Sequence, residues 1–170
     1  MDAFIEVARP EDVPALVRSA AALFREDGGR RDPHMDVDWP ERDGSAYYDG
    51  MVTGPDTLAL LVRLGGPGGP VAGHLTGQLR APDELRPDAV VAVLVSMRVA
   101  EELRGKGVGT ELVGRFLAWA QERGANEASV SAYAANTGAL RFYEACGFEP
   151  HEVTLSTAVR RRSPGAGRLT

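Results

Sequence analysis

The sequence predicts a mixed α/β sandwich formed by one domain. The apolar run from Val90 to Val99 is typical of a strand that is buried on both faces. It is followed by a glycine-rich turn and by a helical pattern whose apolar residues share one stripe. Further strand and helix patterns give the order β-α-(α)-β-β-β-α-β-α-β, and we therefore expect a central sheet covered by helices.

The N-terminal part of the chain predicts one strand and two helices. Phe4 to Arg9 has the composition of a short strand, and Pro10 then opens a helix with acidic residues in its first turn. The pair Gly28–Gly29 ends this helix, because its apolar stripe stops there. A shorter helix is expected from about Arg42 to Met51.

The middle of the chain predicts a β-hairpin. Thr57 to Leu64 and Val71 to Arg80 have strand patterns, and a turn rich in glycine and proline separates them. His74 lies among polar neighbours on the second strand. It is either an ordinary surface or hydrogen-bonded histidine or a residue that contacts a substrate.

The C-terminal part predicts a strand, a helix and a final strand. Glu127 to Tyr133 forms the first strand, and Asn136 is a good N-cap for a helix whose C′ residue is Gly147. Val153 to Val159 is expected to be the last strand. The domain should span residues 1–160, and residues 161–170 are expected to form a flexible tail.

Composition excludes several classes of protein. The chain has 170 residues, 44% of them hydrophobic, which suits one globular domain with a substantial core. A net charge of -5 argues against nucleic-acid binding, and no apolar run reaches the length of about 18 residues that spans a membrane. The single cysteine suits a reducing compartment, and no signal peptide is recognised at the start. We expect a cytoplasmic protein without a metal.

The glycine-rich turn is a candidate site for a diphosphate. Gly105, Gly107 and Gly109 stand between a buried strand and the N-terminus of an amphipathic helix. The first N–H groups of a helix have no internal partner, and glycines let a phosphate approach the backbone. Arg104 and Lys106 add positive charge. The spacing fits neither a P-loop nor a dinucleotide fingerprint, and a packing turn without a ligand is the alternative.

The segment from Arg30 to Met51 is polar, irregular and acidic. It is either a solvated loop with a few anchoring aromatic residues or a lid over a substrate. Carboxylates beside aromatic rings favour a cationic guest through ion pairing and cation–π contact. The candidate substrate contacts are therefore Asp36, Asp38, Trp39, Tyr47 and Tyr48.

Two motifs, in this order, resemble those of the GNAT superfamily of N-acetyltransferases. Arg104-x-x-Gly107-x-Gly109 resembles the acetyl-CoA loop of that family. Asn136-x-x-Ala139-x-x-x-Tyr143-x-x-x-Gly147-Phe148 is similar to its second motif, and one helix plus one strand separate the two. The resemblance covers about residues 3–160.

The resemblance implies a GNAT-like fold, with a mixed, mostly antiparallel sheet whose two central strands splay apart around acetyl-CoA. Tyr143 would be the general acid that protonates the thiolate after an amine attacks the thioester. A small cationic amine is the expected acceptor, and homodimers are common in the family. The positions that would contact the acetyl-CoA cosubstrate are Met97, Val99, Arg104, Gly105, Lys106, Gly107, Val108, Gly109, Thr110 and Asn136.

The chain departs from the family pattern in its general base. Members often carry a glutamate on the central strand, but Val90 to Ala100 contains no acidic residue. A primary alkylamine has a pKa of about 10.4 and must lose a proton before it attacks. Water, Ser96, or an acid such as Glu101, Asp36 or Asp38 could take it. A protein N-terminal or lysine acetyltransferase, or a non-catalytic acyl-CoA-binding module, remain alternatives.

Overall fold

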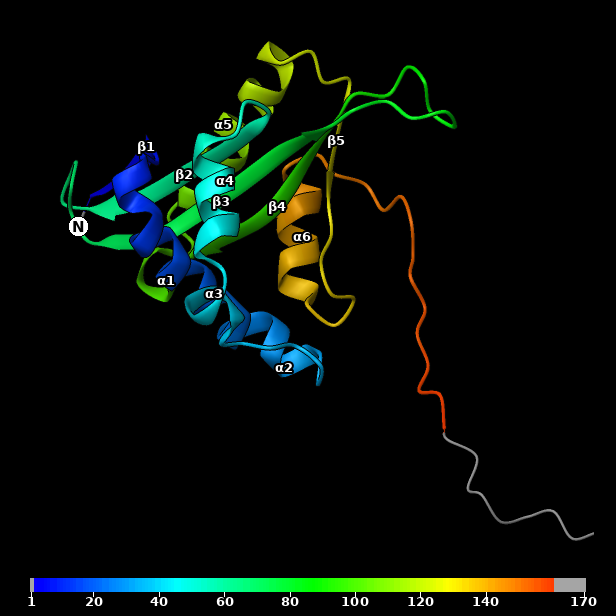
Figure 1. Cartoon of the computed structure of the whole chain (residues 1–170), viewed down its shortest axis with the longest axis horizontal. Helices are drawn as coiled ribbons and strands as arrows, with labels where there is room; N and C mark the ends of the chain where they lie inside the picture. The colour runs from blue at the N-terminus through cyan, green and yellow to red at the C-terminus, as the bar shows by residue number, and fades with distance from the viewer. Residues whose placement is uncertain (1, 161–170) are drawn as a thin grey trace, which may run out of the picture.

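A computed structural model describes residues 2–160, and within them five strands form one sheet in the order β1-β2-β3-β4-β5. Helices cover both faces of this sheet (Figure 1). The strands are β1 (Ala3–Val7), β2 (Thr57–Leu64), β3 (Val71–Arg80), β4 (Val91–Val99) and β5 (Glu127–Val130). The helices are α1 (Val13–Leu23), α2 (Gly29–Arg31), α3 (Trp39–Arg42), α4 (Ser45–Thr53), α5 (Val108–Glu122) and α6 (Thr137–Ala145).

The pairing of the strands confirms the predicted fold class and the predicted hairpin. β1 to β4 pair antiparallel with their neighbours, and β2 and β3 are the two arms of the hairpin. Only β5 runs parallel to its neighbour β4. This parallel pairing is short, since it joins Val91 to Glu127 at one end and already stops at the pair Leu94 and Val130.

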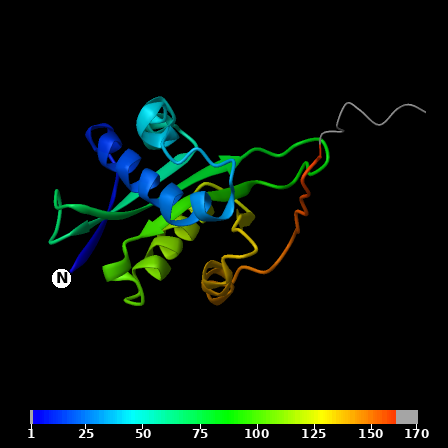
Figure 2. The same cartoon turned by 90° about the horizontal axis from the view of Figure 1, so that it is seen from below.

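Two apolar layers hold the helices to the sheet. On one face, α5 buries Leu112 and Phe116 completely against the sheet. On the other face, α1 and α4 pack on β2 through Leu16, Tyr48 and Leu61. Figure 2 shows α1 and α4 on one side of the sheet, and α5 and α6 on the other. No helix within residues 2–160 has the length and apolarity needed to cross a membrane.

Three elements differ most from their predicted bounds. α1 ends at Leu23, and the chain continues through a π-helical turn, Phe24–Gly28, before it reaches α2. The short helix α3 precedes the predicted helix, which begins only at Ser45. β5 ends at Val130, because the chain leaves β4 there and has no further strand to pair with.

The predicted final strand, Val153 to Val159, is wrong. The segment carries no regular secondary structure and runs away from the body of the molecule (Figure 1). Its apolar side chains are exposed, with 90% of Leu155 accessible to solvent. Strand propensity reflects packing on neighbouring strands, and this segment has no such neighbour. The predicted tail, residues 161–170, lies outside the described residues.

Candidate active site

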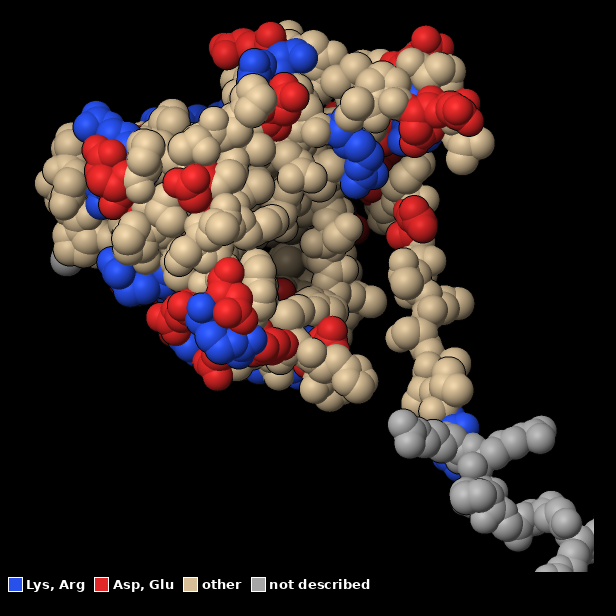
Figure 3. Space-filling model, viewed as in Figure 1, with Lys and Arg blue, Asp and Glu red and all other residues tan. Residues whose placement is uncertain are grey.

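β4 and β5 part in the middle of β4 and leave a notch beside it. Beyond Leu94, the edge of β4 that faces away from β3 has no strand partner. A β-bulge lies at the same place, since Thr76 of β3 pairs with Ser96 while the next residue, Gly77, pairs with Leu94. The surface is hollowed next to α6, over this part of β4 (Figure 3). The predicted splayed strands are therefore present.

The loop that follows β4 presents backbone N–H groups at one end of the notch. Gly105 and Gly107 have φ of 71° and 82°, a region that side chains other than glycine rarely adopt. A Cβ atom on either would meet no atom within 4 Å, so the loop is open to a ligand. The first main-chain bond of α5 runs from the N–H of Glu111 to the carbonyl of Gly107. The amides of Val108, Gly109 and Thr110 come before this bond, so they have no partner within the helix.

Each remaining position of the predicted acetyl-CoA loop has a defined environment. Lys106 and Thr110 are exposed, whereas Val108 is buried in the core under α5. Gly109 is needed for close packing, because a Cβ there would lie 3.2 Å from the ring of Phe142 on α6. Met97 packs partly buried against the core.

Arg104 is folded back onto the protein. Its Nε donates to the carbonyl oxygen of Val99 at 2.9 Å, and its Nη2 lies 3.1 Å from Oε2 of Glu26. The other oxygen of Glu26 accepts from Arg98 on β4 at 2.7 Å. Glu26 belongs to the π-helical turn after α1, so this turn is clamped to the end of β4. No local pattern in the sequence distinguishes Glu26 or Arg98 as a member of this site.

Asn136 is the N-cap of α6, as predicted. Its Oδ1 accepts from the amide of Ala139 at 3.1 Å, and its Nδ2 donates to Oδ1 of Asp27 at 2.9 Å. Asp27 also forms an ion pair of 2.9 Å with Arg31. The side chain of Asn136 therefore holds the helix start and the turn after α1 together, on the side of the notch opposite to β4.

Tyr143 lies about two turns beyond Asn136 along α6. Its ring packs edge-on against Phe142 and Phe148, with centroid distances of 5.2 and 5.7 Å. Burial, with smaller effects of Cys146 and Asp27, raises the pKa of the Tyr143 phenol to about 12. Every buried side-chain nitrogen or oxygen of the described residues has a hydrogen-bond partner. No hydrogen bond joins the Tyr143 hydroxyl to a group of residues 2–160, and the side chain is partly buried against the core.

Carboxylates lie near the tyrosines at the mouth of the notch. Tyr133 follows β5, and the pKa of its phenol is raised by burial and by the charges of Asp32 and Asp27. Asp27 influences Tyr143 in the same way. These two acids stand in a charged stretch after the apolar stripe of α1. Their position on the sequence gave no local signal, because the contacts join segments about a hundred residues apart.

The predicted substrate residues on the acidic segment form a separate cluster. Trp39, Tyr47 and Tyr48 contact one another, with centroid distances from 5.1 to 6.3 Å, and Tyr48 is 3% exposed in the core beneath α1. Asp36 pairs with Arg42 at 2.7 Å, and Asp38 with Arg25 at 3.0 Å. Within residues 2–160, no hydrogen bond, ion pair or ring contact joins these five residues to α6 or to the glycine loop.

Cys146 and the depression at the far end of the sheet contribute nothing to the notch. Burial raises the pKa of the Cys146 thiol, which keeps it protonated, and the side chain packs against the core.

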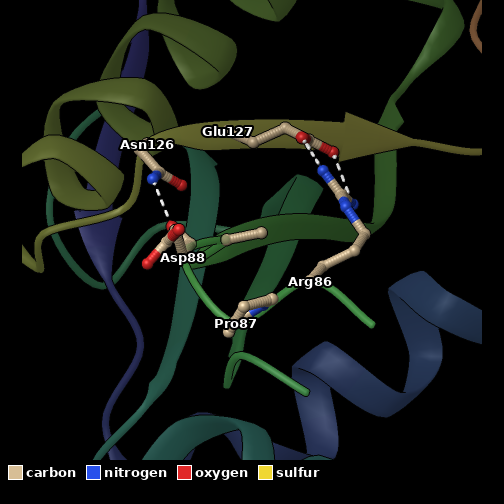
Figure 4. Close-up of a pocket in the computed structure, with 6 residues that line it drawn as sticks. Arg86, Pro87, Asp88, Asn126 and Glu127 are labelled. Atoms are coloured by element: carbon tan, nitrogen blue, oxygen red, sulfur yellow. Dashed lines mark hydrogen bonds and ion pairs between the residues drawn. The ribbon is translucent and has the colours of Figure 1, made fainter. Parts of the chain in front are cut away.

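A depression of about 390 Å³ lies where β4 and β5 begin, and the ion pair between Arg86 and Glu127 crosses it (Figure 4). It is at the opposite end of the two strands from the glycine loop.

The model of the acetyltransferase (GNAT) family matches residues 16–148. The chain belongs to this family. An uncharacterised N-acetyltransferase of Methanocaldococcus jannaschii, MJ1207, is 35% identical over 63 residues, which are 37% of this chain and 28% of that protein. The chain thus matches only about a quarter of that relative's length.

Solved structures agree on the fold. A tetramutant of the BH1408 protein from Bacillus halodurans superposes with a TM-score of 0.80, at 15% identity, over 92% of this chain and 99% of that one. The aminoglycoside N-acetyltransferase AAC(6')-Iy in complex with CoA gives 0.69, at 16% identity, over 94% and 95%. The aminoglycoside acetyltransferase meta-AAC0020, from an uncultured soil metagenomic sample and in complex with sisomicin, gives 0.65, at 17% identity, over 93% and 97%.

Proposed function

We propose that this protein transfers an acetyl group from acetyl-CoA to the amine of a small cationic acceptor. The observation that carries the proposal is the notch itself. Its wall is the unpaired edge of β4, the open glycine loop lies at one end, and α6, which carries Tyr143, packs beside that loop through Phe142. Family membership supports the same reaction, and two relatives with this fold bind CoA and an aminoglycoside according to their names.

The residues present fit the diphosphate of coenzyme A. The amides at the start of α5 supply donors, the helix dipole adds partial positive charge, and Lys106 is free to move toward an anion from an exposed position. Arg104 can join them once it leaves Glu26. The extended edge of β4 offers backbone groups to the amide-containing arm of the cosubstrate.

The acceptor is expected to enter from the side of Asp27 and Asp32. These carboxylates lie close enough to Tyr133 and Tyr143 to shift the pKa of both phenols upward. Asp27 is paired with Arg31, whereas Asp32 forms no ion pair with residues 2–160, and its negative charge would attract an ammonium group. A polyamine, an aminoglycoside or a comparable amino metabolite has the matching charge. The aromatic cluster of α3 and α4 would not touch the acceptor but would support the segment that carries Asp27 and Asp32.

Tyr143 would donate a hydrogen bond, and then its proton, to the leaving sulfur. A phenol with a pKa of about 12 remains protonated at neutral pH and is ready to donate. Full transfer to an ordinary thiolate, with a pKa of about 8.5, would cost roughly 5 kcal/mol. Burial of the sulfur in the notch would raise the pKa of the thiol as well, and the difference between the pKa values of phenol and thiol would then be smaller.

The test is to mix the purified protein with acetyl-CoA and a panel of amines that includes sisomicin, spermidine and lysine-containing peptides. Thiol release that depends on the amine, with the acetylated product found by mass spectrometry, is the expected result. Acetyl-CoA binding without thiol release would instead support an acyl-CoA-binding module, and acetylation of peptides alone would support a protein acetyltransferase. Tyr143→Phe should lower kcat by about 10²-fold while the Kd of acetyl-CoA stays within twofold.

A further inference from the structure

Four polar side chains form a continuous hydrogen-bonded chain between α1 and the sheet. Ser19 Oγ on α1 lies 2.7 Å from Nδ1 of His74 on β3, and Nε2 of His74 lies 3.0 Å from Ser96 Oγ on β4. Thr76 Oγ1 completes the group at 2.8 Å from Ser96 Oγ. Both ring nitrogens of His74 are therefore bonded to hydroxyl groups.

The two ends of this chain reach solvent at different places, although its centre is buried. His74 is 0% exposed and Ser19 is 5% exposed. Ser96 is partly accessible and lies on the stretch of β4 that has lost its β5 partner, which is the wall of the notch. Ser19 lines a surface depression of about 400 Å³ on the α1 side of the sheet, whose lining also includes Arg18, Arg63 and Arg98.

Resting on the acetyl transfer proposed above, we propose that Ser96, His74 and Ser19 carry a proton from the acceptor ammonium in the notch to solvent at the Ser19 depression. This path supplies the base that β4 lacks, since Val91 to Val99 contains no acidic side chain. Ser96 is the residue that would touch the acceptor, whereas His74 and Ser19 act through it.

The hydrogens have one arrangement that allows this transfer. Nδ1–H of His74 donates to Ser19, the hydroxyl of Ser96 donates to Nε2, and the hydroxyl of Thr76 donates to Ser96. One lone pair of Ser96 Oγ then stays free for an N–H of the acceptor. With Nε2–H instead, Ser96 would receive a hydrogen bond from the ring and could not pass a proton to it.

The transfer balances without any residue holding a charge. The ammonium N–H bond breaks as Ser96 Oγ takes the proton, and the Ser96 hydroxyl hydrogen moves to Nε2. The Nδ1 hydrogen moves to Ser19, whose own hydroxyl hydrogen goes to water. The first tautomer returns after the product has left and water has entered the notch. Nε2 then gives its hydrogen back to Ser96, whose hydroxyl hydrogen goes to that water, while Ser19 takes a hydrogen from water and passes its own to Nδ1.

The surroundings of His74 suit a relay and exclude a stored positive charge. Burial, and the nearby guanidinium of Arg98, lower the pKa of His74 to about 3. Arg98 pairs with His74 across β3 and β4 and is itself held by Glu26. The imidazole is therefore neutral at every working pH, and only a concerted transfer passes through it.

The first arm of the test needs no acceptor. In ¹⁵N-labelled protein, the signals of His74 are assigned by comparison with the variants His34→Gln and His151→Gln, both of which replace exposed side chains. Its ¹⁵N shifts should show the Nδ1–H tautomer, and Ser19→Ala should convert it to Nε2–H. An Nε2–H tautomer in the unaltered protein overturns the proposal.

The second arm uses L-lysinamide, which carries an ε-amine with a pKa of about 10.4 and an α-amine with a pKa of about 8 in one molecule. At pH 8, Ser19→Ala should lower ε-acetylation about tenfold and α-acetylation less than twofold, because only the ε-amine arrives almost fully protonated. Replacement of the buried His74 itself is avoided, since it endangers the fold.

Thr76→Val is the matched control, because it removes one hydrogen bond of the same group but leaves the connection from Ser96 to Ser19 intact. An equal loss of both products in Ser19→Ala, or the same change of product ratio in Thr76→Val, would show a purely structural role. If the unaltered protein acetylates neither amine of L-lysinamide, the proposed acetyl transfer to this acceptor is contradicted. The tautomer of His74 is measured without an acceptor, so it still tests the proton path by itself.

Discussion

Nδ2 of Asn136 donates a hydrogen bond of 2.9 Å to Oδ1 of Asp27 and so joins two segments that lie 109 positions apart in the chain. The first segment is the π-helical turn after α1, and the second is the start of α6, which carries Tyr143. This bond sets how far α6 stands from the wall of the notch.

Asn136 performs two tasks that can be separated by mutation. Asn136→Ala loses the N-cap of α6 as well as the bond to Asp27, and we expect the free energy of unfolding to fall by about 2 kcal/mol. Asn136→Ser keeps a good cap but cannot reach Asp27, so it should recover about 1 kcal/mol of this loss. Urea denaturation of the three proteins measures both values. Equal stability of the two variants would show that the cap contributes little.

Glu26 competes with an anionic ligand for Arg104. Glu26→Gln should free the guanidinium and lower the Kd of coenzyme A by roughly twofold to fivefold, because charge-assisted pairs at partly exposed sites are worth up to about 1 kcal/mol. Isothermal titration calorimetry measures the change. Glu102→Gln removes a negative charge from the same loop, where Glu102 forms no ion pair with residues 2–160, and an identical gain there would indicate a general effect of charge.

The left-handed backbone of Gly107 can be tested against an ordinary helical glycine. Gly107 has φ of 82°, so Gly107→Ala should destabilise the fold by about 1–2 kcal/mol and should also weaken coenzyme A binding. Gly114 lies inside α5, and a Cβ there meets nothing within 4 Å. Gly114→Ala should stabilise the fold by about 0.5–1 kcal/mol with unchanged binding. Thermal unfolding and calorimetry would contradict this account if both variants behaved alike.

The raised pKa of Tyr143 predicts how the protein responds to alkaline pH. The folded state favours the neutral phenol, so the stabilisation is complete below the ordinary pKa near 10 and is lost as the pH rises through about 12. A spectroscopic titration of the phenols, compared with that of Tyr143→Phe, should show that the missing group is one of the two that titrate near pH 12, the other being that of Tyr48. Ionisation of this group near pH 10 would contradict its burial. Turnover should show no decline from Tyr143 below pH 10.

Local patterns were sufficient for most of the fold. The alternation in Val71 to Arg80 and the glycine-rich turn before it predicted the hairpin, and Asn136 could be recognised as a cap because capping depends on residues three apart. The glycines at 105 and 107 indicated a turn that a ligand can approach, and both have the positive φ that glycine allows.

Long-range contacts could not be predicted in this way. The bonds from Glu26 to Arg98 and from Asp27 to Asn136 join residues 72 and 109 positions apart, and no periodicity refers to such pairs. The wrong strand at Val153 has a related cause. Its alternating apolar residues have the same pattern whether or not a neighbouring strand is present, and only the tertiary structure decides that.

The extra residue at Val95 sets the phase of everything that follows it in β4. Because of it, Leu94 lies opposite Gly77 on the α5 face, whereas Ser96 lies opposite Thr76 on the α1 face. Deleting this one residue would move the side chains from Ser96 to Val99 to the opposite faces of the sheet, and Ser96 would then point into the apolar layer under α5. Insertions and deletions should therefore be tolerated in the hairpin turn at 65–70, where they leave the strand register unchanged. They should not be tolerated at position 95, where they would change it.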